Sequence, residues 1–125
     1  MREIIFRAKR KDNGEWVEGY YQKRFDLDEN EQHLIFWSKN YTVWEYVEVN
    51  PDTICQYTGL TDKNGRKIFE NDILDCGMNL RVSWHTFKAS WVLSKKGWLY
   101  NHYFGESVEP EDVEVVGNIF DNPEL

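Results

Sequence analysis

Short stretches of alternating apolar and polar residues run along this chain, and turn-forming residues separate them. Ile4, Phe6 and Ala8 alternate with other side chains and predict an opening strand. The segment Lys11–Gly14 ends in Asn-Gly, which accepts the positive φ angles of a tight hairpin, so residues 16–21 are expected to form the returning strand. No stretch keeps the apolar spacing of an amphipathic helix over ten or more residues. The pattern therefore predicts sheet rather than helix.

The same alternation predicts strands in the rest of the chain. We expect them at residues 33–38, 43–49, 67–69, 72–76, 80–84, 89–94, 98–100 and 113–120. Turn signals lie between them at Lys39-Asn40, Asn64-Gly65 and Lys95–Gly97. Gly117 inside the last strand indicates a bulge, and Pro110–Asp112 is expected to form a short turn or 3₁₀ segment.

Many short strands with frequent turns predict an all-β fold, a sandwich or small barrel with at most one short helix. Pro51 lacks the amide hydrogen that a central strand needs, so Asn50–Asp52 is expected to join two halves. The chain has the length of one domain, and the alternative is one domain with two lobes, 1–50 and 51–125. Glu70–Ile73 resembles the entry to the first long strand of SH3-like barrels, so we expect a barrel-like second half.

Composition adds three constraints. Aromatic residues make up 16% of the chain, and such side chains suit half-buried, pleated surfaces. The formal charge of −7 disfavours a general phosphate-binding role, which needs a basic stripe. Cys55 and Cys76 are the only cysteines, and the start of the chain resembles neither a signal peptide nor a membrane span. These features indicate reduced thiols in a soluble cytosolic protein.

No arrangement for catalysis or metal binding emerges from the sequence. No spacing or flanking motif links any two of the candidate nucleophiles and bases, which are Cys55, Cys76, His33, His85 and His102. A zinc site needs closely paired ligands, which are absent. The acidic loop at residues 26–31 lacks the glycine and glutamate of an EF-hand, and there is no glycine-rich phosphate loop. We therefore expect no enzymatic activity, no metal and no cofactor.

Two longer segments carry motifs that go beyond general β character. Residues 56–74 have the sequence QYTGLTDKNGRKIFENDIL, and residues 113–125 have the sequence VEVVGNIFDNPEL. The first resembles the QYTGLKDKNGKEIYEGDIV signature of YopX-like proteins, and the second resembles their EVIGNIYENPEL terminus. Residues 2–8 are similar to the REIKFRAW start of the same family. The matches cover about a third of the chain, in the family's order.

The resemblance implies a cytosolic protein encoded by a phage or prophage, with a β-rich fold and a tendency to self-associate. It implies no activity. We interpret the signature residues as architectural, and they are Gln56, Tyr57, Thr58, Gly59, Leu60, Asp62, Asn64, Gly65, Asp72, Gly117, Asn118, Asn122 and Pro123. Asn71 stands where the family usually has glycine, and asparagine tolerates the left-handed conformation. Residues 20–50 match nothing in the family pattern, and partner specificity is expected there.

Protein–protein contact is the leading functional hypothesis. Aromatic residues are enriched at interfaces, and Tyr41, Trp44 and Tyr46 are the natural anchors if they are exposed. The expected partners are further copies of the chain and an unidentified host or phage protein, with no membrane partner.

Two alternatives remain open. In the first, nucleic acid stacks on tryptophans beside basic residues, and the candidates are Trp84, Trp91, Trp98, Arg81, Lys88, Lys95 and Lys96. Trp84 and Trp91 lie in apolar alternation, however, and are expected to fill the core. In the second, a row of carboxylates mimics DNA, formed by Glu106, Glu109, Glu111, Asp112 and Glu114. Such a row is more often simply a solvated face.

Overall fold

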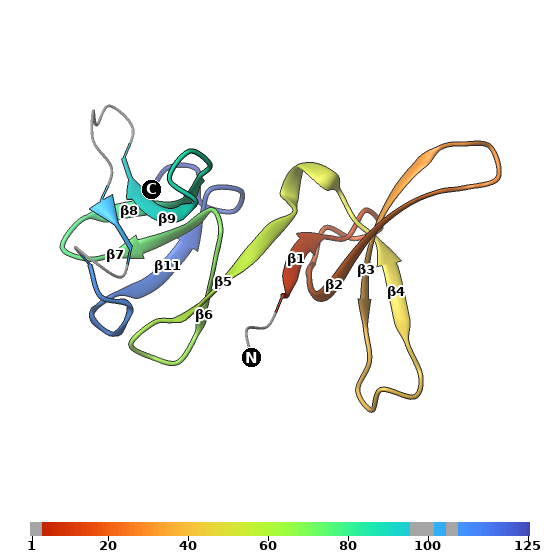
Figure 1. Ribbon diagram of the computed structural model, residues 1–125, viewed down its shortest axis with the longest axis horizontal. Helices are drawn as coiled ribbons and strands as arrows, with labels where there is room; N and C mark the ends of the chain where they lie inside the picture. The colour runs from red at the N-terminus through yellow and green to blue at the C-terminus, as the bar shows by residue number, and fades with distance from the viewer. Residues whose placement is uncertain (1–3, 96–101, 105–107) are drawn as a thin grey trace. The chain divides into compact units, whose positions relative to one another are not determined.

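The computed structural model describes residues 4–95, 102–104 and 108–125. The chain divides into two compact units, residues 1–57 and residues 58–125. Both are built from antiparallel strands, as Figure 1 shows. Within the described residues the helical segments are two 3₁₀ turns, η1 (Pro51–Thr53) and η2 (Pro110–Asp112). The all-β prediction is confirmed, and so is the short 3₁₀ segment expected at Pro110.

The first unit is an antiparallel sheet in the order β4-β3-β2-β1-β5. Its strands are β1 (Phe6–Lys9), β2 (Trp16–Phe25), β3 (Glu31–Trp37), β4 (Glu45–Glu48) and the start of β5 (Cys55–Thr61). Cys55 and Gln56 of β5 pair with Arg7 and Phe6 of β1. For this reason the boundary between the units falls within β5, at residues 57 and 58, and not at Pro51.

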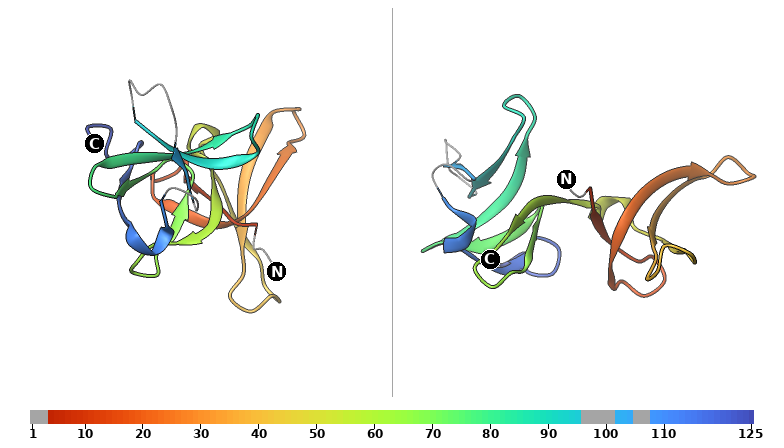
Figure 2. Two further views of the ribbon diagram at one scale, coloured as in Figure 1. Left: turned by 60° about the vertical axis from the view of Figure 1, so that its left-hand side comes forward. Right: turned by 60° about the horizontal axis from the view of Figure 1, so that its bottom comes forward.

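Gly19 is the point at which β2 changes partners. Residues before it pair with β1, whereas Tyr20 and the residues after it pair with β3. A Cβ atom at Gly19 would lie 2.1 Å from the carbonyl oxygen of Phe36, so no other residue fits this close approach of two backbones. The long β2–β3 hairpin curves along its length (Figure 2). One face of the sheet encloses a small core around Ala8, Ile35 and Val49.

The end of β4 also contacts the end of β1. The backbone N–H of Lys11 donates to the carbonyl oxygen of Glu48 at 3.1 Å, and the N–H of Asn50 donates to that of Lys9 at 2.8 Å. These bonds occupy the outer edge of β4 from Glu48 onward. The outer edge at residues 45–47 takes no part in them.

The second unit contains an open antiparallel sheet in the order β10-β9-β8-β7-β11. Its strands are β7 (Asp72–Asp75), β8 (Asn79–His85), β9 (Ser90–Ser94), β10 (His102–Tyr103) and β11 (Glu114–Asn118). The short strand β6 (Lys67–Phe69) pairs with the later part of β5. Within the described residues the sheet does not close into a barrel. Its core is formed by Ile68, Leu74, Leu80, Val82, Leu93, Val113 and Val115.

Local signals in the second half place most elements correctly. The register between β7 and β11 shifts between Val115 and Gly117, which confirms the predicted bulge. β9 pairs with β8 through a turn at residues 86–89, and the partner strand expected at 98–100 lies outside the described residues. The prediction that Trp84 fills the core is wrong, because its side chain is 42% exposed. Trp84 lies at the end of β8, and its ring contacts Trp91, which packs against the core.

Candidate interaction surface

Aromatic side chains line the face of β2, β3 and β4 that points away from the small core. Tyr20 lies opposite Phe36, and Phe36 lies opposite Tyr46. Directly opposite residues of antiparallel strands share one face, so these three rings form a row across the sheet. The Phe36 and Tyr46 rings stack with their centroids 5.1 Å apart. Ile35, next to Phe36, points to the other face and is fully buried.

Two residues from the β3–β4 connection extend the row. The Trp44 ring lies 5.8 Å from that of Tyr20, and the Tyr41 ring lies 6.3 Å from that of Trp44. We call these five residues, Tyr20, Phe36, Tyr41, Trp44 and Tyr46, the aromatic surface. Tyr41, Trp44 and Tyr46 were expected from the sequence as interaction anchors, and all three are exposed. Tyr20 and Phe36 were not anticipated.

The connection that carries Tyr41 is held by its own hydrogen bonds. The Ser38 hydroxyl donates to the carbonyl oxygen of Val43 at 2.6 Å and accepts the N–H of Tyr41 at 2.9 Å. The Asn40 side-chain oxygen accepts the N–H groups of Thr42 and Val43, at 3.0 and 3.1 Å. These bonds present Tyr41 on an ordered turn, which lowers the entropy lost when a partner contacts it.

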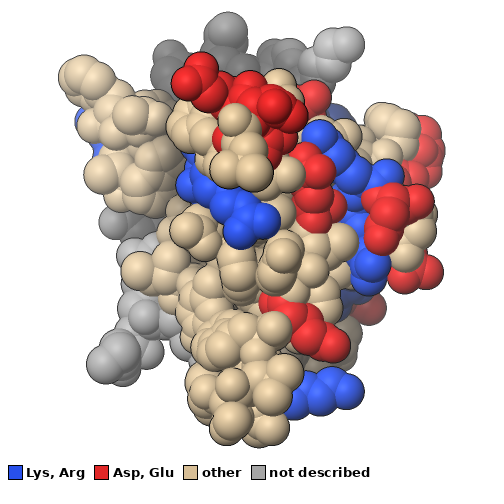
Figure 3. All heavy atoms as spheres, turned by 90° about the vertical axis from the view of Figure 1, so that its right-hand side faces the viewer, with Lys and Arg blue, Asp and Glu red and all other residues tan. Residues whose placement is uncertain are grey.

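Charges of both signs surround the aromatic surface. The Arg24 guanidinium lies 5.2 Å from the centre of the Tyr46 ring. Glu45 accepts the indole N–H of Trp37 at 2.8 Å, and Glu48 forms an ion pair with Lys11 at 3.1 Å. Figure 3 views the structure from the side on which Figure 1 draws β2, β3 and β4. Acidic side chains gather at the top of that view, and largely uncharged surface lies below.

A chain of four polar groups joins β2 to β3. The Tyr21 hydroxyl is hydrogen-bonded to Nδ1 of His33, and Nε2 of His33 lies 3.1 Å from Glu31. Glu31 also forms an ion pair with Lys23 at 2.7 Å. The hydrogen bond from Lys23, followed by that from His33, lowers the pKa of the Glu31 carboxyl, and the same bond raises the pKa of Lys23. This network stabilises the hairpin beside the core.

The thiols of both cysteines donate hydrogen bonds to backbone carbonyl oxygens. Cys55 is fully buried and its thiol donates to the carbonyl oxygen of Thr53 at 3.3 Å. The Cys76 thiol donates to the carbonyl oxygen of Met78 at 3.5 Å. Neither cysteine forms a disulfide in the described residues. Among the same residues no group of His, Cys, Asp and Glu side chains has the geometry to hold a metal.

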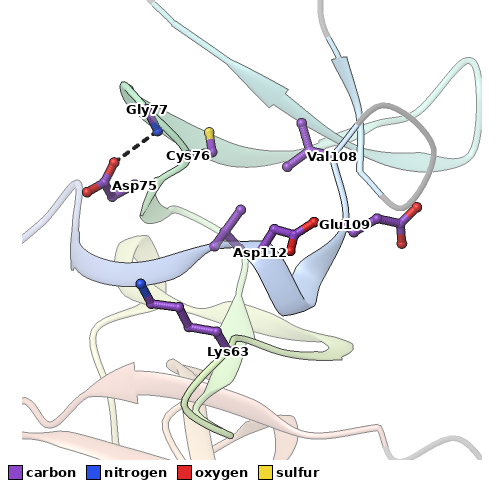
Figure 4. A pocket seen from close by; sticks show the side chains of 8 residues that line it. Lys63, Asp75, Cys76, Gly77, Val108, Glu109 and Asp112 are labelled. Atoms are coloured by element: carbon purple, nitrogen blue, oxygen red, sulfur yellow. Dashed lines mark hydrogen bonds between the residues drawn. The ribbon is translucent and has the colours of Figure 1, made fainter.

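An open depression of about 460 Å³ lies in the second unit beside Cys76 (Figure 4). Its lining includes Lys63, Asp75, Cys76, Gly77, Glu109 and Asp112. Asp75 accepts the N–H of Gly77 at 3.1 Å, which fixes the β7–β8 turn. Burial, and secondarily the charge of Asp75, raises the pKa of the Cys76 thiol, so this cysteine is held in its less reactive protonated form.

Asp62 connects the two segments that carry the family resemblance. Its Oδ1 accepts the N–H groups of Asn64 and Arg66, each at 2.9 Å, and so closes the turn that contains Gly65. Its Oδ2 accepts the N–H of Val115 in β11 at 3.0 Å. This N–H lies on the edge of the sheet, and the side chain of Asp62 is buried against it.

The remaining residues of the first signature segment also have structural partners. Gln56 pairs with β1, and the Tyr57 N–H donates to the carbonyl oxygen of Ile5 at 2.8 Å. The Thr58 hydroxyl donates to the carbonyl oxygen of Ile68 and accepts the N–H of Leu60. Gly59 has φ +88°, the backbone bend expected at this position.

The turn between β6 and β7 uses two further residues of the first signature segment. Asn71 has φ 70°, the left-handed conformation expected for it. Asp72 is fully buried and accepts the N–H of Phe69 at 2.8 Å.

The C-terminal signature segment forms a capped turn after β11. The Asn118 side-chain oxygen accepts the N–H groups of Phe120 and Asp121, at 3.0 and 2.9 Å. The Asn122 side-chain oxygen accepts the N–H of Asn118 at 3.3 Å, and the exposed Pro123 follows. A Cβ atom at Gly117 would lie 2.4 Å from that same oxygen of Asn122. The Asn122 side chain thus bonds to Asn118 and packs in the space that the missing Cβ of Gly117 leaves.

Some residues of the two alternative hypotheses have partners within the second unit. The Arg81 guanidinium donates to the side-chain oxygen of Asn71 at 2.7 Å and so is bound to the turn before β7. Glu114 pairs with Lys63 at 3.7 Å, and the acidic residues of η2, Glu111 and Asp112, are exposed. Lys96, Trp98 and Glu106 lie outside the described residues.

Comparison with known families identifies the chain. A family model described as "YopX protein" matches residues 5–125. The protein belongs to the YopX family. The matched range contains the motifs at residues 56–74 and 113–125, which the Asp62–Val115 bond joins.

A solved structure shares the YopX fold. The chain resembles the crystal structure of protein EF1440 from Enterococcus faecalis with a TM-score of 0.56 and 22% identity, over 99% of this chain and 98% of that chain. No curated protein matches the chain significantly. In the described residues no helix is long and apolar enough to cross a membrane.

Proposed function

We propose that this YopX protein works by protein–protein contact, that it assembles with further copies of itself through the aromatic surface, and that it catalyses no reaction. The supporting observation is the exposure of Tyr20, Tyr41, Trp44 and Tyr46, at 50, 78, 44 and 54%. With about 200 Å² removed from water per fully buried ring residue, these fractions amount to roughly 450 Å². A stable interface takes about 800 Å² from each partner, so the aromatic surface supplies more than half of that area.

The charges at the aromatic surface are compatible with a second copy as the partner. Each chain carries a formal charge of −7, so two copies repel one another on average. The Arg24 guanidinium lies 5.2 Å from the centre of the Tyr46 ring and the Glu48 carboxylate pairs with Lys11, so the charges at this place do not oppose contact. An interface between identical copies requires a surface that complements itself, and a neutral aromatic patch with a mixed-charge rim meets that requirement.

The setting follows from the family. We regard the protein as an accessory protein encoded by a phage or prophage, acting in the cytoplasm of a bacterial host. The support for this is the membership of the YopX family over residues 5–125 together with the origin that the sequence resemblance implies.

Sedimentation velocity of matched variants tests the proposal. Trp44→Ser is expected to shift the association midpoint at least tenfold towards higher concentration, because it removes the ring that joins Tyr20 to Tyr41. Phe87→Ser is the control, since Phe87 is 89% exposed in the second unit and lies outside the aromatic surface. Equal sedimentation of the two variants and the wild type at every concentration would refute the role of the aromatic surface.

A further inference from the structure

The outer edge of β4 is unprotected just where the aromatic surface ends. The N–H of Val49 donates to the carbonyl oxygen of His33 at 2.9 Å, so Val49 directs its backbone groups to β3. Backbone groups alternate in direction along a strand, and Val47 therefore also faces β3, whereas Tyr46 and Glu48 face outward. Lys11 binds the carbonyl oxygen of Glu48. No bond to the outward N–H and carbonyl oxygen of Tyr46 is present among the residues that the structure describes.

Natural edge strands are usually blocked against pairing by charged side chains, especially lysine, by proline, by a bulge or by a covering segment. The sequence of β4, Glu45-Tyr46-Val47-Glu48, has neither proline nor lysine, and its two charges lie at its ends, which leaves Tyr46 and Val47 between them uncharged. Its register with β3 runs without interruption from Glu45 to Glu48, so there is no bulge. The strand thus offers both main-chain bonds and, through Tyr46, an exposed ring on the same element.

We propose that two copies of the chain join edge to edge, with their β4 strands antiparallel and Tyr46 of one copy directly opposite Tyr46 of the other. This inference rests on the self-association proposed above and specifies its geometry. The pair of tyrosines would exchange two N–H···O=C bonds. Each row of Tyr20, Phe36 and Tyr46 would then continue into the same row of the second copy.

Three conditions select this register. A two-fold axis within a strand pair places one residue opposite its own counterpart, and that residue must have outward backbone groups, which leaves Tyr46 and Glu48. The carbonyl oxygen of Glu48 is already bonded to Lys11, and a Glu48 pair would place two carboxylates in contact. The Tyr46 register instead places Glu45 opposite Val47, and the pairing ends before Glu48, where Lys11 occupies the outer edge, so no like charges face each other directly.

Disulfide trapping tests the register. Residues of a hydrogen-bonded antiparallel pair have Cα atoms about 5.5 Å apart, within the roughly 4.4–6.8 Å that a disulfide spans. Tyr46→Cys in a Cys76→Ser background is expected to form a covalent dimer under mild oxidation, while the buried Cys55 stays unreactive. Tyr41→Cys in the same background is the control, because residue 41 lies in the turn between β3 and β4, five positions from the two-fold axis, and the register does not bring its two copies together. Efficient cross-linking of Tyr41→Cys without cross-linking of Tyr46→Cys would overturn the register.

Proline at position 46 provides an independent test of the main-chain bonds. Tyr46→Pro removes an N–H that β3 does not use, and it is expected to abolish dimers, whereas Tyr46→Phe keeps that N–H and should remain dimeric. If the wild type is monomeric, the proposed self-association itself fails. If the wild type is dimeric but Tyr46→Cys does not cross-link and Tyr46→Pro still dimerises with unchanged circular dichroism, only the edge-to-edge geometry fails.

Discussion

The Asp62 carboxylate accepts the backbone N–H of Val115 at 3.0 Å, across 53 positions of sequence. The same carboxylate accepts the N–H of Arg66 and so closes the Asp62–Arg66 turn. One side chain therefore stabilises a hairpin and also binds a backbone N–H on the edge strand β11. The neighbouring backbone adds a second link, because the N–H of Lys63 donates to the carbonyl oxygen of Val113 at 3.0 Å. Two motifs that look separate in the sequence are therefore one structural device, which supports an architectural interpretation of the family signature.

Removing the Asp62 carboxylate is expected to destabilise the second unit. Asp62→Ala leaves the buried N–H of Val115 without its acceptor and opens the turn, so the free energy of unfolding should fall by about 2–4 kcal/mol. Urea denaturation followed by tryptophan fluorescence measures this change. Asp52→Ala removes an exposed carboxylate from the first unit and serves as the control. A loss below about 0.5 kcal/mol for Asp62→Ala would show that water replaces the carboxylate without cost.

The same carboxylate predicts a loss of stability in acid. Burial alone would raise the pKa of Asp62, but the hydrogen bonds from Val115, Arg66 and Asn64 outweigh burial and hold the pKa below the ordinary value of 3.8. A lowered folded-state pKa contributes stability that is complete above the unfolded-state value and disappears as the pH falls through the folded-state value. The stability difference between the wild type and Asp62→Asn should therefore be constant from pH 7 to 5 and shrink below about pH 4. A difference that stays constant down to pH 2 would contradict this role of Asp62.

Gly19 should tolerate no side chain. Gly19→Ala places its Cβ 2.1 Å from the carbonyl oxygen of Phe36, and neither backbone can withdraw without breaking the β2–β3 pairing. We expect a loss of about 3 kcal/mol or more, measured by thermal and urea unfolding. Gln22→Ala, at an exposed position three residues further along β2, should change stability by less than about 0.5 kcal/mol. Equal stability of the two variants would show that the strands separate easily at Gly19.

Gly117 and Asn122 should show energetic coupling. Gly117→Ala brings its Cβ within 2.4 Å of the Asn122 side-chain oxygen and should destabilise the turn by about 1–3 kcal/mol. In an Asn122→Ala background that oxygen is absent, so the same substitution should cost less. A double-mutant cycle by urea denaturation measures the coupling, which we expect to exceed about 0.5 kcal/mol. Strict additivity would show that the two residues act independently.

Local chemistry made much of the fold predictable from the sequence. The Asn-Gly turn at Gly65, the 3₁₀ turn at Pro110 and the bulge at Gly117 each follow from the backbone preferences of one or two residues. The left-handed conformation of Asn71 follows in the same way. Long-range relationships were not accessible, because neither Asp62 nor Val115 carries a local mark of its partner.

The candidate surface was only partly predictable, since alternation assigns residues to two faces without showing which face is covered. Tyr41, Trp44 and Tyr46 were identified by residue type, whereas Tyr20 and Phe36 became evident only from the register of β2, β3 and β4. Glu18 and Gln22, which lie two positions before and after Tyr20 and so on its side of the strand, are polar, and they were the signal of an exposed ring. The same ambiguity explains the error at Trp84, which shares a face with Leu80 and Val82 but extends past the core that covers them.

The molar mass of the wild-type protein in solution tests the central claim most directly. Size-exclusion chromatography with multi-angle light scattering should be run over at least a hundredfold range of loading concentration. Self-association through the aromatic surface predicts a mass that rises from the 15.0 kDa of one chain towards twice that value. A mass that stays at 15.0 kDa at every concentration would contradict the claim and leave the exposed rings to a different partner.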